Sequence, residues 1–345
     1  MIDLRSDTVT LPTPRMREAM SRAELGDDVF GEDPTVNRLQ EMAAERMGKE
    51  AALFVASGTM ANLVSLLTHC GRGEEAIMGH MAHTFLFEAG GASTLGGISI
   101  YTVPNQPNGT LRPADVEAAI RADNVHYPRT RLLCLENTHN RCGGAVLTAE
   151  QMRSAISVAR AHGLSVHLDG ARIFNAAVAL GIPARVLAAE VDTVNFCLSK
   201  GLAAPVGSLI CGSKSFIAEA RRWRKAVGGG MRQAGVLAAA GIVALEEMVD
   251  RLSEDHANAR LLARAIAGIH GLSLDPKTVR SNIVIFEVTS PKVTPAQVSA
   301  QLLENGVKIN PIEGRKMRAV THYGIEQSDI EQAIRVLEKV MRAVA

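Results

Sequence analysis

The sequence predicts an α/β protein with a mainly parallel, seven-stranded sheet and a smaller α+β domain at its C-terminal end. Short apolar runs alternate with helical patterns up to Gly228, and this alternation is typical of a parallel sheet with helices on both faces. After Gly228 a long helical segment over 232–269 precedes a mixture of strands and helices. We therefore expect a large domain over residues 1–250, including an N-terminal arm, and a small domain over 251–345.

The expected elements follow from apolar runs and from helix-end signals. The candidate strands of the large sheet are 52–56, 76–79, 98–103, 131–136, 165–169, 193–198 and 207–211. In the small domain we expect strands over 282–288, 307–310 and 317–321 and a helix over 294–305. Asp33-Pro34 predicts a helix start and Gly48 its end, because proline favours the first helical position and glycine the position after the last. Capping boxes at Thr148–Gln151 and Ser328–Glu331 predict two further starts.

The composition indicates a globular chain without an electrostatic signature for nucleic acid. The 345 residues carry 37 basic and 36 acidic side chains, and only 3% are aromatic. No apolar run reaches the roughly 18 residues of a membrane span, and the start MIDLRSDTVT does not resemble a signal peptide. The five cysteines are odd in number and lack CxxC spacing, which favours reduced thiols. We expect a cytoplasmic protein that binds neither membranes nor nucleic acid.

The stretch VNFCLSKGLAAPVGS is the centre of the predicted site. Its apolar run ends at Lys200 and a turn of small residues follows, so the amine lies where water is scarce. A neutral amine in such a place attacks an aldehyde and forms a Schiff base. The alternative is an ordinary lysine at a strand end with its charge in water.

A second apolar run, VHLDGAR, ends in Asp169. A lysine and a strand-end aspartate are the pair that pyridoxal 5'-phosphate (PLP) requires. The lysine holds the aldehyde, and the carboxylate keeps the pyridine nitrogen protonated so that the ring withdraws electrons. A turn or helix cap before Gly170 is the alternative role of Asp169.

The segment FVASGTMAN has the order strand, turn and helix start, and it predicts an anion site. The amides of Gly58 and Thr59, the Thr59 hydroxyl and the helix start all favour a phosphate group. A plain N-cap at Ser57 or Thr59 is the alternative. No G-x-G-x-x-G follows a strand and no G-x-x-x-x-G-K-[ST] is present, which disfavours a dinucleotide fold and a P-loop.

Motifs spread along the whole chain carry a family resemblance. In chain order they are IDLRSDTVT, GDDVFGEDP, EAALFVASGTMAN, LENTHN, VHLDGARIFNA, CLSKGLAAPVGS, GGGMRQAG and VTH. Together they make the chain similar to the L-threonine aldolase family, and to its low-specificity or L-allo-threonine type in particular. The resemblance implies the aspartate-aminotransferase fold (PLP fold type I), PLP as cofactor, and retro-aldol cleavage of L-threonine or L-allo-threonine to glycine and acetaldehyde. Such a lyase belongs to amino acid metabolism, in threonine catabolism and glycine biosynthesis.

The resemblance also implies roles for individual residues. The catalytic candidates are Lys200, His83 and His126. The cofactor-binding candidates are Gly58, Thr59, His83, Asp169, Arg172, Lys200 and Arg232. The candidates for the substrate carboxylate are Ser6, Arg172 and Arg318. His83 matches a histidine stacked on the cofactor ring, and His126 matches one near the substrate hydroxyl. Whether a metal ion is also bound stays open at this point.

Two further expectations concern the surroundings of this site. The segment Gly79–Ala82 lacks the acidic or serine residue that often precedes the stacked histidine, which leaves open how His83 is tuned. Arg232 and Lys225 match basic residues that reach a neighbouring subunit's site, so we expect a shared site in a homotetramer. For Arg221 and Arg222 we expect a solvated basic helix face.

Two alternatives remain at this point. Another PLP enzyme of fold type I, such as an aminotransferase, a serine hydroxymethyltransferase-like enzyme or a β-eliminating lyase, would share the cofactor band. Release of acetaldehyde from L-threonine without a keto acid or folate distinguishes the aldolase. A regulatory protein that kept the fold would show neither a cofactor band nor a borohydride-sensitive lysine.

Overall fold

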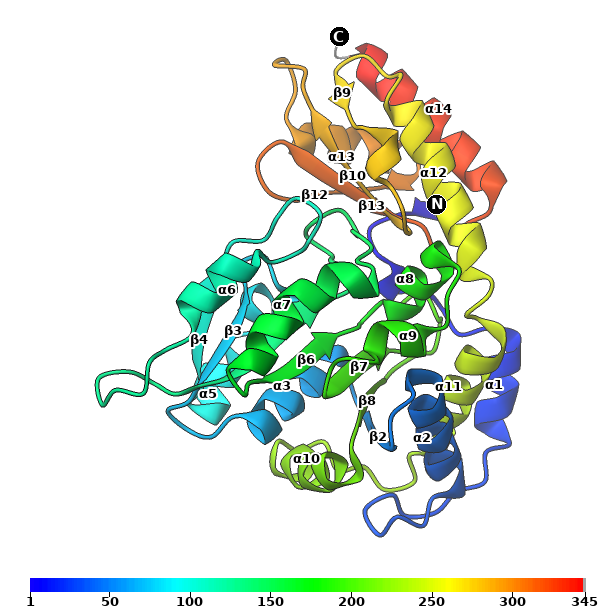
Figure 1. Ribbon diagram of the computed structural model, residues 1–345. Coiled ribbons are helices and arrows are strands. Elements are labelled where there is room, and N and C mark those ends of the chain that lie inside the picture. The colour runs from blue at the N-terminus through cyan, green and yellow to red at the C-terminus, as the bar shows by residue number, and fades with distance from the viewer. Residues whose placement is uncertain (344–345) are drawn as a thin grey trace.

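The computed structural model describes residues 1–343 and has a seven-stranded sheet at its centre (Figure 1). The strands are β2 Ala51–Val55, β3 Glu75–Gly79, β4 Ser99–Val103, β5 Thr130–Glu136, β6 Ser165–Asp169, β7 Thr193–Cys197 and β8 Ser208–Gly212. Their order in space is β2-β8-β7-β6-β5-β3-β4. Strands β3 to β7 run parallel to one another, whereas β8 is antiparallel to both β7 and β2. The predicted seven-stranded, mainly parallel sheet is confirmed.

Helices cover both faces of this sheet, as the alternating pattern predicts. They are α1 Pro14–Ser21, α2 Pro34–Met47, α3 Gly58–His69, α4 His83–Leu86, α5 Gly91–Gly96, α6 Pro113–Ala119, α7 Ala149–Ala161, α8 Ile173–Leu180, α9 Ala184–Ala188, α10 Lys214–Ala226 and α11 Gly235–Glu247. In Figure 1, α7 and α8 lie in front of the sheet and α3 lies behind it. Apolar side chains between these layers form the main core, in which Phe54, Leu168 and Phe196 are fully buried.

Most helix ends lie where the local signals predict them. The Asp33 carboxylate accepts the amides of two residues in the first turn of α2, and Gly48 ends that helix in the left-handed conformation. The capping box at Thr148–Gln151 is present at the start of α7. The box expected at Ser328–Glu331 is wrong, because α14 (Gln327–Ala343) already begins at Gln327. The reason is Asp329, whose carboxylate accepts the amide of Glu326 at 2.9 Å and fixes an earlier start.

The C-terminal part of the chain forms a second, smaller sheet. Its order is β12-β13-β10-β9, with β9 Leu272–Ser273, β10 Ile283–Val288, β12 Asn310–Pro311 and β13 Lys316–Val320. Helices α12 Leu252–Ile266, α13 Pro295–Glu304 and α14 pack on it. The long helical segment after Gly228 is thus two helices, α11 and α12, with a break between them. The strand expected over 307–310 is divided, because β11 (Val307–Lys308) pairs elsewhere while β12 joins β13.

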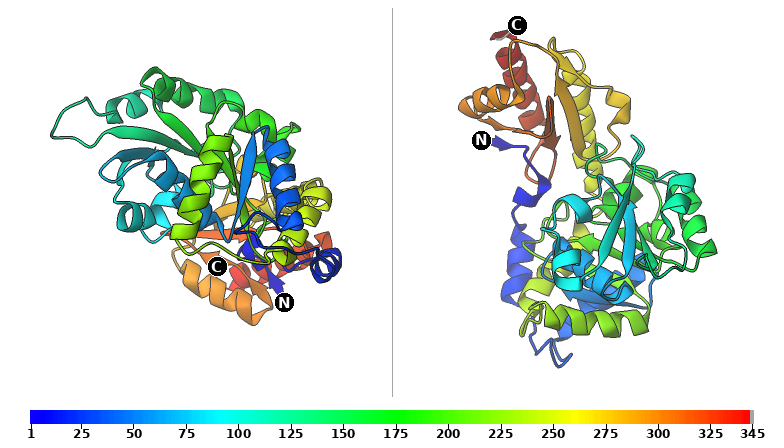
Figure 2. Two further views of the ribbon diagram at one scale, coloured as in Figure 1. Left: turned by 90° about the horizontal axis from the view of Figure 1, so that it is seen from below. Right: turned by 90° about the vertical axis from the view of Figure 1, so that its left-hand side faces the viewer.

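The N-terminus lies beside this second sheet (Figure 2). Strand β1 (Ile2–Asp3) pairs in parallel with β11, and Ile2 and Leu4 belong to the core of the smaller sheet. The chain then passes through a short 3-10 helix, η1 (Asp7–Val9), to reach α1. A second 3-10 turn, η2, covers Pro276–Thr278. The domain boundary near residue 250 stays a prediction. The arm residues Ile2 and Leu4, which we expected in the large domain, pack in the core of the smaller sheet.

Within residues 1–343, no helix is both long enough and apolar enough to pass through a lipid bilayer.

Candidate active site

The carboxyl ends of three parallel strands bring the predicted lysine and aspartate to one edge of the large sheet. Asp169 ends β6, and the register pairs it with Glu136 on β5 and Asn195 on β7. Lys200 follows β7 in a tight turn, in which the amide of Ala203 donates to the Lys200 carbonyl oxygen at 2.9 Å. Parallel strands end at a common edge, so these groups meet although they are distant in sequence.

The Asp169 side chain is buried and ionised. Burial raises its pKa, but the charges of Lys200 and His83 outweigh burial and hold the pKa below its usual value. Asn62 Nδ2 donates to Oδ2 at 2.8 Å, and the Ala171 amide donates to Oδ1 at 3.0 Å. A buried carboxylate held in this way beside a lysine suits the protonated nitrogen of a pyridine ring.

His83 lies at the start of α4 and faces the same group of charges. Its amide donates to the Glu136 carboxylate at 2.8 Å, and its ring nitrogen Nδ1 lies 2.9 Å from Oε1 of Glu88. The hydrogen bond to Glu88 raises the pKa of His83, with a further contribution from the charge of Asp169.

Glu88 is the partner of His83 that the sequence analysis missed. The expected acid upstream of the histidine is indeed lacking, and the acid comes five residues downstream instead. Its side chain is only 5% exposed, and burial raises its pKa. An acidic residue inside the otherwise apolar run TFLFEAG was the available signal. Asn62 was missed as well, although it is an amide among apolar residues at the start of α3.

The start of α3 forms the predicted anion site. Ser57 is the N-cap, and its hydroxyl accepts the amide of Met60 at 3.1 Å. Within the described residues, the amides of Gly58 and Thr59 have no hydrogen-bond acceptor. A Cβ atom on Gly58 would lie 2.8 Å from the Cys197 sulfur, so only glycine fits there. The open amides lie beside the strand that leads to Lys200, and a cofactor phosphate suits them.

Arg172 is already engaged with an acid from the N-terminal arm. Its Nε and Nη2 atoms donate to the two carboxylate oxygens of Asp7, both at 2.7 Å, and both side chains are buried. Burial raises the pKa of Asp7, but the charge of Arg172 overcomes this and holds the pKa below its usual range. Asn282, the residue before β10, donates to the same carboxylate at 3.2 Å. Asp7 was not foreseen as the partner of Arg172.

Arg318 extends from β13 of the smaller sheet toward the large one. Its Nη1 donates to Asn140 Oδ1 at 2.9 Å, and its Nη2 lies 3.4 Å from the carbonyl oxygen of Arg5. Burial lowers its pKa, and the charge of Arg172 adds to this, so the two guanidinium groups are close. Ser6 lies next to Asp7 in the N-terminal arm, where its hydroxyl accepts from Thr8 Oγ1 at 2.9 Å.

His126 does not join this group within one chain. It lies exposed in the loop 121–129 that precedes β5, and this loop extends away from the sheet in Figure 1. The loop enters the strand at its amino end, whereas Lys200 and Asp169 lie at the carboxyl edge. Strand β5 has 7 residues, so about 20 Å separates the two edges.

The basic residues of the α10 region take different places. Arg232 is 54% exposed and binds Asp27 at 2.9 Å. Lys225 and Arg222 are exposed. The expectation that Arg221 is solvated is wrong, because its guanidinium donates to the carbonyl oxygens of Asp28 and Val29.

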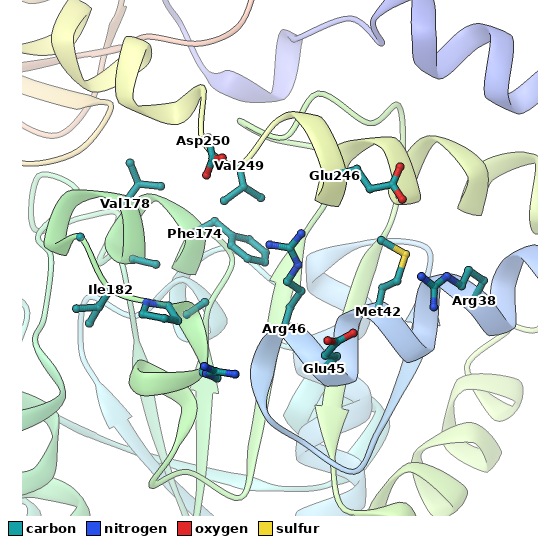
Figure 3. Close-up of a pocket in the computed structure, with 15 residues that line it drawn as sticks. Arg38, Met42, Glu45, Arg46, Phe174, Val178, Ile182, Glu246, Val249 and Asp250 are labelled. Atoms are coloured by element: carbon teal, nitrogen blue, oxygen red, sulfur yellow. The ribbon is translucent and has the colours of Figure 1, made fainter.

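A cavity of about 860 Å³ lies between α2, α8, α9 and the end of α11 (Figure 3). Arg46, Phe174 and Asp250 are among its lining residues. Neither Lys200 nor Asp169 lines it, so this cavity is separate from the candidate site.

The chain is similar in sequence to a described protein family and to named relatives. A family model described as beta-eliminating lyase matches residues 3–289. The chain is 54% identical over 336 residues to the low specificity L-threonine aldolase of Escherichia coli (strain K12), which covers 96% of this chain and 97% of that protein. It is 47% identical over 346 residues to the probable low-specificity L-threonine aldolase 2 of Arabidopsis thaliana, covering 99% and 98% of the two chains.

Solved structures share the fold over the whole length. A Leishmania major threonine aldolase matches with a TM-score of 0.82 and 22% identity, covering 100% of both chains. A Sphingomonas wittichii serine palmitoyltransferase matches with a TM-score of 0.79 and 19% identity, covering 99% of this chain and 88% of that one. The predicted aspartate-aminotransferase-like fold, PLP fold type I, is therefore confirmed. Since the identity to the curated aldolases extends from end to end, the chain belongs to the low-specificity L-threonine aldolase family of carbon–carbon lyases.

Proposed function

We propose that the site around Lys200 carries out PLP-dependent cleavage of L-threonine and L-allo-threonine to glycine and acetaldehyde. The observation that carries this proposal is the ionised, buried Asp169 beside Lys200 at one edge of the sheet. The names of the curated relatives favour threonine as substrate over the reactions of other enzymes with this fold.

The residues present suit the cofactor at each of its parts. Lys200 would hold the aldehyde, Asp169 the pyridine nitrogen, and the amides of Gly58 and Thr59 the phosphate. His83 would lie against the ring. When bound, PLP takes up the electron pair that remains on Cα after the Cα–Cβ bond breaks.

The substrate carboxylate would bind at Arg318, with Ser6 beside it. An arginine fork binds a carboxylate through two parallel hydrogen bonds, which fixes the rotation about the bond to Cα. Arg172 would contribute less charge, because Asp7 already neutralises it. We assign to Arg172 mainly a structural role, in which its ion pair with Asp7 holds the N-terminal arm beside the site.

A base must also take the proton of the β-hydroxyl group, and two histidines are candidates. His83 is provided by the same chain, and Glu88 occupies its Nδ1, so its Nε2 is the atom that would act. His126 lies at the opposite edge of the sheet, so it would act only in a neighbouring subunit's site.

An assembly with shared sites would explain several exposed groups. Phe85, Leu86 and Phe87, next to His83, are 43%, 43% and 51% exposed, and large exposed apolar side chains favour a protein interface. Arg232 and Lys225 are the cations that would reach the partner's cofactor phosphate. We propose that two chains form a dimer with shared sites and that two of these dimers form a homotetramer. We place this homotetramer in the cytoplasm.

The direct test is to incubate the purified, PLP-loaded protein with L-threonine and L-allo-threonine separately. We expect acetaldehyde and glycine in equal amounts without any added keto acid or folate. Formation of 2-oxobutanoate and ammonia would instead identify an eliminating enzyme, and transfer of the amino group to a keto acid would identify an aminotransferase.

A second test addresses the cofactor itself. Borohydride reduction followed by peptide mapping should find the cofactor label on Lys200. A label on Lys214 or Lys225 would contradict the assignment, and the absence of both label and absorption band would favour a protein that kept only the fold.

A further inference from the structure

Glu88 connects the two residues that face the proposed cofactor ring. One oxygen of its buried carboxylate, Oε1, lies 2.9 Å from His83 Nδ1 and 2.8 Å from Asn62 Nδ2. The same Asn62 nitrogen donates to Asp169 Oδ2 at 2.8 Å. His83, Glu88, Asn62 and Asp169 therefore form one continuous hydrogen-bonded chain.

The two carboxylates fix which end of the Asn62 amide faces them. Ionised carboxylate oxygens only accept hydrogen bonds, whereas the amide nitrogen of asparagine carries two hydrogens. One hydrogen suits Asp169 and the other suits Glu88. Asn62 is thus the bridge that keeps two buried acids apart and satisfied at the same time.

The other end of the Asn62 amide is held from within the core. Its Oδ1 accepts from His167 Nε2 at 3.1 Å and from Asn195 Nδ2. Burial lowers the pKa of His167 to about 4, so this ring is neutral and has a single N–H. With that hydrogen on Nε2, His167 Nδ1 accepts from the Thr193 hydroxyl at 2.9 Å. The core therefore orients Asn62 in one direction only.

We propose that Glu88 is a positioning residue for the aldolase reaction, which keeps the proton of His83 on Nδ1 and directs Nε2 toward the substrate, while Asn62 links this pair to Asp169. The inference rests on the proposed function for its cofactor and substrate, but its geometry lies wholly within this chain. Neither Glu88 nor Asn62 was among the expected site residues.

The titration of His83 follows from all the charged groups that face it. Glu88 follows α4, Asp169 ends β6, Glu136 ends β5 and accepts the His83 amide, and Lys200 follows β7. The hydrogen bond to Glu88 raises the pKa of His83 most, Asp169 adds to it, and burial and Lys200 oppose it. Loss of the Glu88 charge should therefore lower the pKa of His83, and without an acceptor beside Nδ1 the proton of the neutral ring should no longer be held there.

The first experiment observes the native, cofactor-free protein. With ¹³C- and ¹⁵N-labelled histidine, NMR titration gives the pKa of His83 and the nitrogen that keeps the proton, and His83→Asn identifies the signal. We expect a pKa above the ordinary 6.5 and a proton on Nδ1 at high pH. A pKa at or below 6.5, or a proton on Nε2, would overturn the proposal.

The second experiment uses variants of Glu88. Glu88→Gln removes the charge, and we expect the pKa of His83 to fall. Glu88→Asp keeps the charge but withdraws it by one methylene, so it tests the hydrogen bond separately. Glu88→Asp should mix the tautomers of His83, whereas Glu88→Gln keeps an oxygen that accepts from Nδ1. Both variants should shift the acidic limb of the kcat/KM profile in parallel with the pKa of His83. If Glu88→Asp retains the native tautomer, Glu88 does not position His83.

Glu75→Gln is the matched control, because Glu75 is also a buried glutamate and pairs with Arg121 at the amino edge of the same sheet. It should leave the His83 signal unchanged. If Glu75→Gln shifts that signal as much as Glu88→Gln, the effect is a general loss of packing and the proposal is overturned. Because NMR needs neither cofactor nor substrate, its result is independent of whether the protein cleaves threonine.

Discussion

The surroundings of Asp169 and those of Arg232 differ in how completely one chain satisfies them. Around Asp169, the side chains of Asn62, Glu88 and His83 are hydrogen-bonded within the chain. Arg232 is 54% exposed, and its guanidinium forms an ion pair with Asp27. The surroundings of Asp169 are therefore buried and hydrogen-bonded within one chain, whereas the surroundings of Arg232 are an open surface.

This difference separates two tasks that the site has to perform. Groups that tune the charge of a cofactor ring need low solvent access and fixed partners, since electrostatic effects are strongest where water is excluded. Groups that come from another subunit must stay exposed until the subunits meet. The contrast predicts that single substitutions act within one chain in the first region and across chains in the second.

The largest effect should come from Asp169→Asn in the buried region. The amide cannot stabilise a protonated pyridine nitrogen, so we expect the rate of acetaldehyde release to fall by about 10²–10³. The cofactor should still bind, because Lys200 and the α3 start remain. Asp192→Asn is the matched control, since Asp192 precedes β7 at the opposite edge and binds Arg160 and the Val166 amide. Near-normal turnover of Asp169→Asn would reduce Asp169 to a structural cap.

The open region is tested by mixing two inactive proteins, Arg232→Ala and Lys200→Ala. In an isologous dimer with shared sites, a mixed dimer has one site with both native groups, so random reassembly should restore about a quarter of wild-type activity. Exchange of subunits is verified with tagged chains. Arg222→Ala controls for loss of a basic side chain, because Arg222 is 82% exposed. No recovery after verified exchange would mean that both groups act in the same chain, or that Arg232 is outside the site.

The sequence predicts the parts of the site that lie at strand ends. Lys200 and Asp169 end apolar runs, and parallel strands end at one edge, so their meeting follows from the pattern. The partners were not predictable in the same way. Asp7 meets Arg172 across 165 positions of sequence, and a pairing of that range leaves no local signal.

Other differences arose because the pattern gives residue identities but not directions. His126 has the expected residue type, yet the connection into β5 places it at the amino edge. A capping box at Ser328 fits the sequence rule, but the competing carboxylate of Asp329 decides where α14 begins. Glu88 was not predicted as the partner of His83, because it follows the histidine by five residues instead of preceding it.

A smaller effect is expected for Arg318→Lys, at the boundary between the two sheets. Lysine offers a point charge instead of a fork, so KM for L-threonine should rise by about tenfold, with a smaller fall in kcat. Steady-state kinetics at saturating cofactor measure both values. Arg315→Lys is the matched control, since Arg315 binds the carbonyl oxygens of Val288, Ser290 and Val293. Arg315→Lys should lower the melting temperature and leave KM for L-threonine unchanged. If the KM of Arg318→Lys equals that of the wild type, the substrate carboxylate binds elsewhere.

The smallest effect concerns stability and tests whether His167, which lies beside Asn62 in the buried region, is neutral in the folded protein. Burial lowers the pKa of His167 from 6.5 to about 4. Between these pH values the unfolded chain binds more protons than the folded one, so stability is lost as the pH falls through this range. One such histidine contributes a slope of at most about 1.4 kcal/mol per pH unit.

His167→Gln removes this titration while its amide can still donate to Asn62. We expect the slope of the unfolding free energy between pH 6.5 and 4 to decrease by up to about 1.4 kcal/mol per pH unit, although the variant is less stable at neutral pH. Urea unfolding at several pH values measures it. His162→Gln, on the surface beside Glu117, controls for the loss of one histidine. If His167→Gln keeps the full slope, His167 is already charged in the folded protein, and the fixed direction of the Asn62 amide would have to come from Asn195 alone.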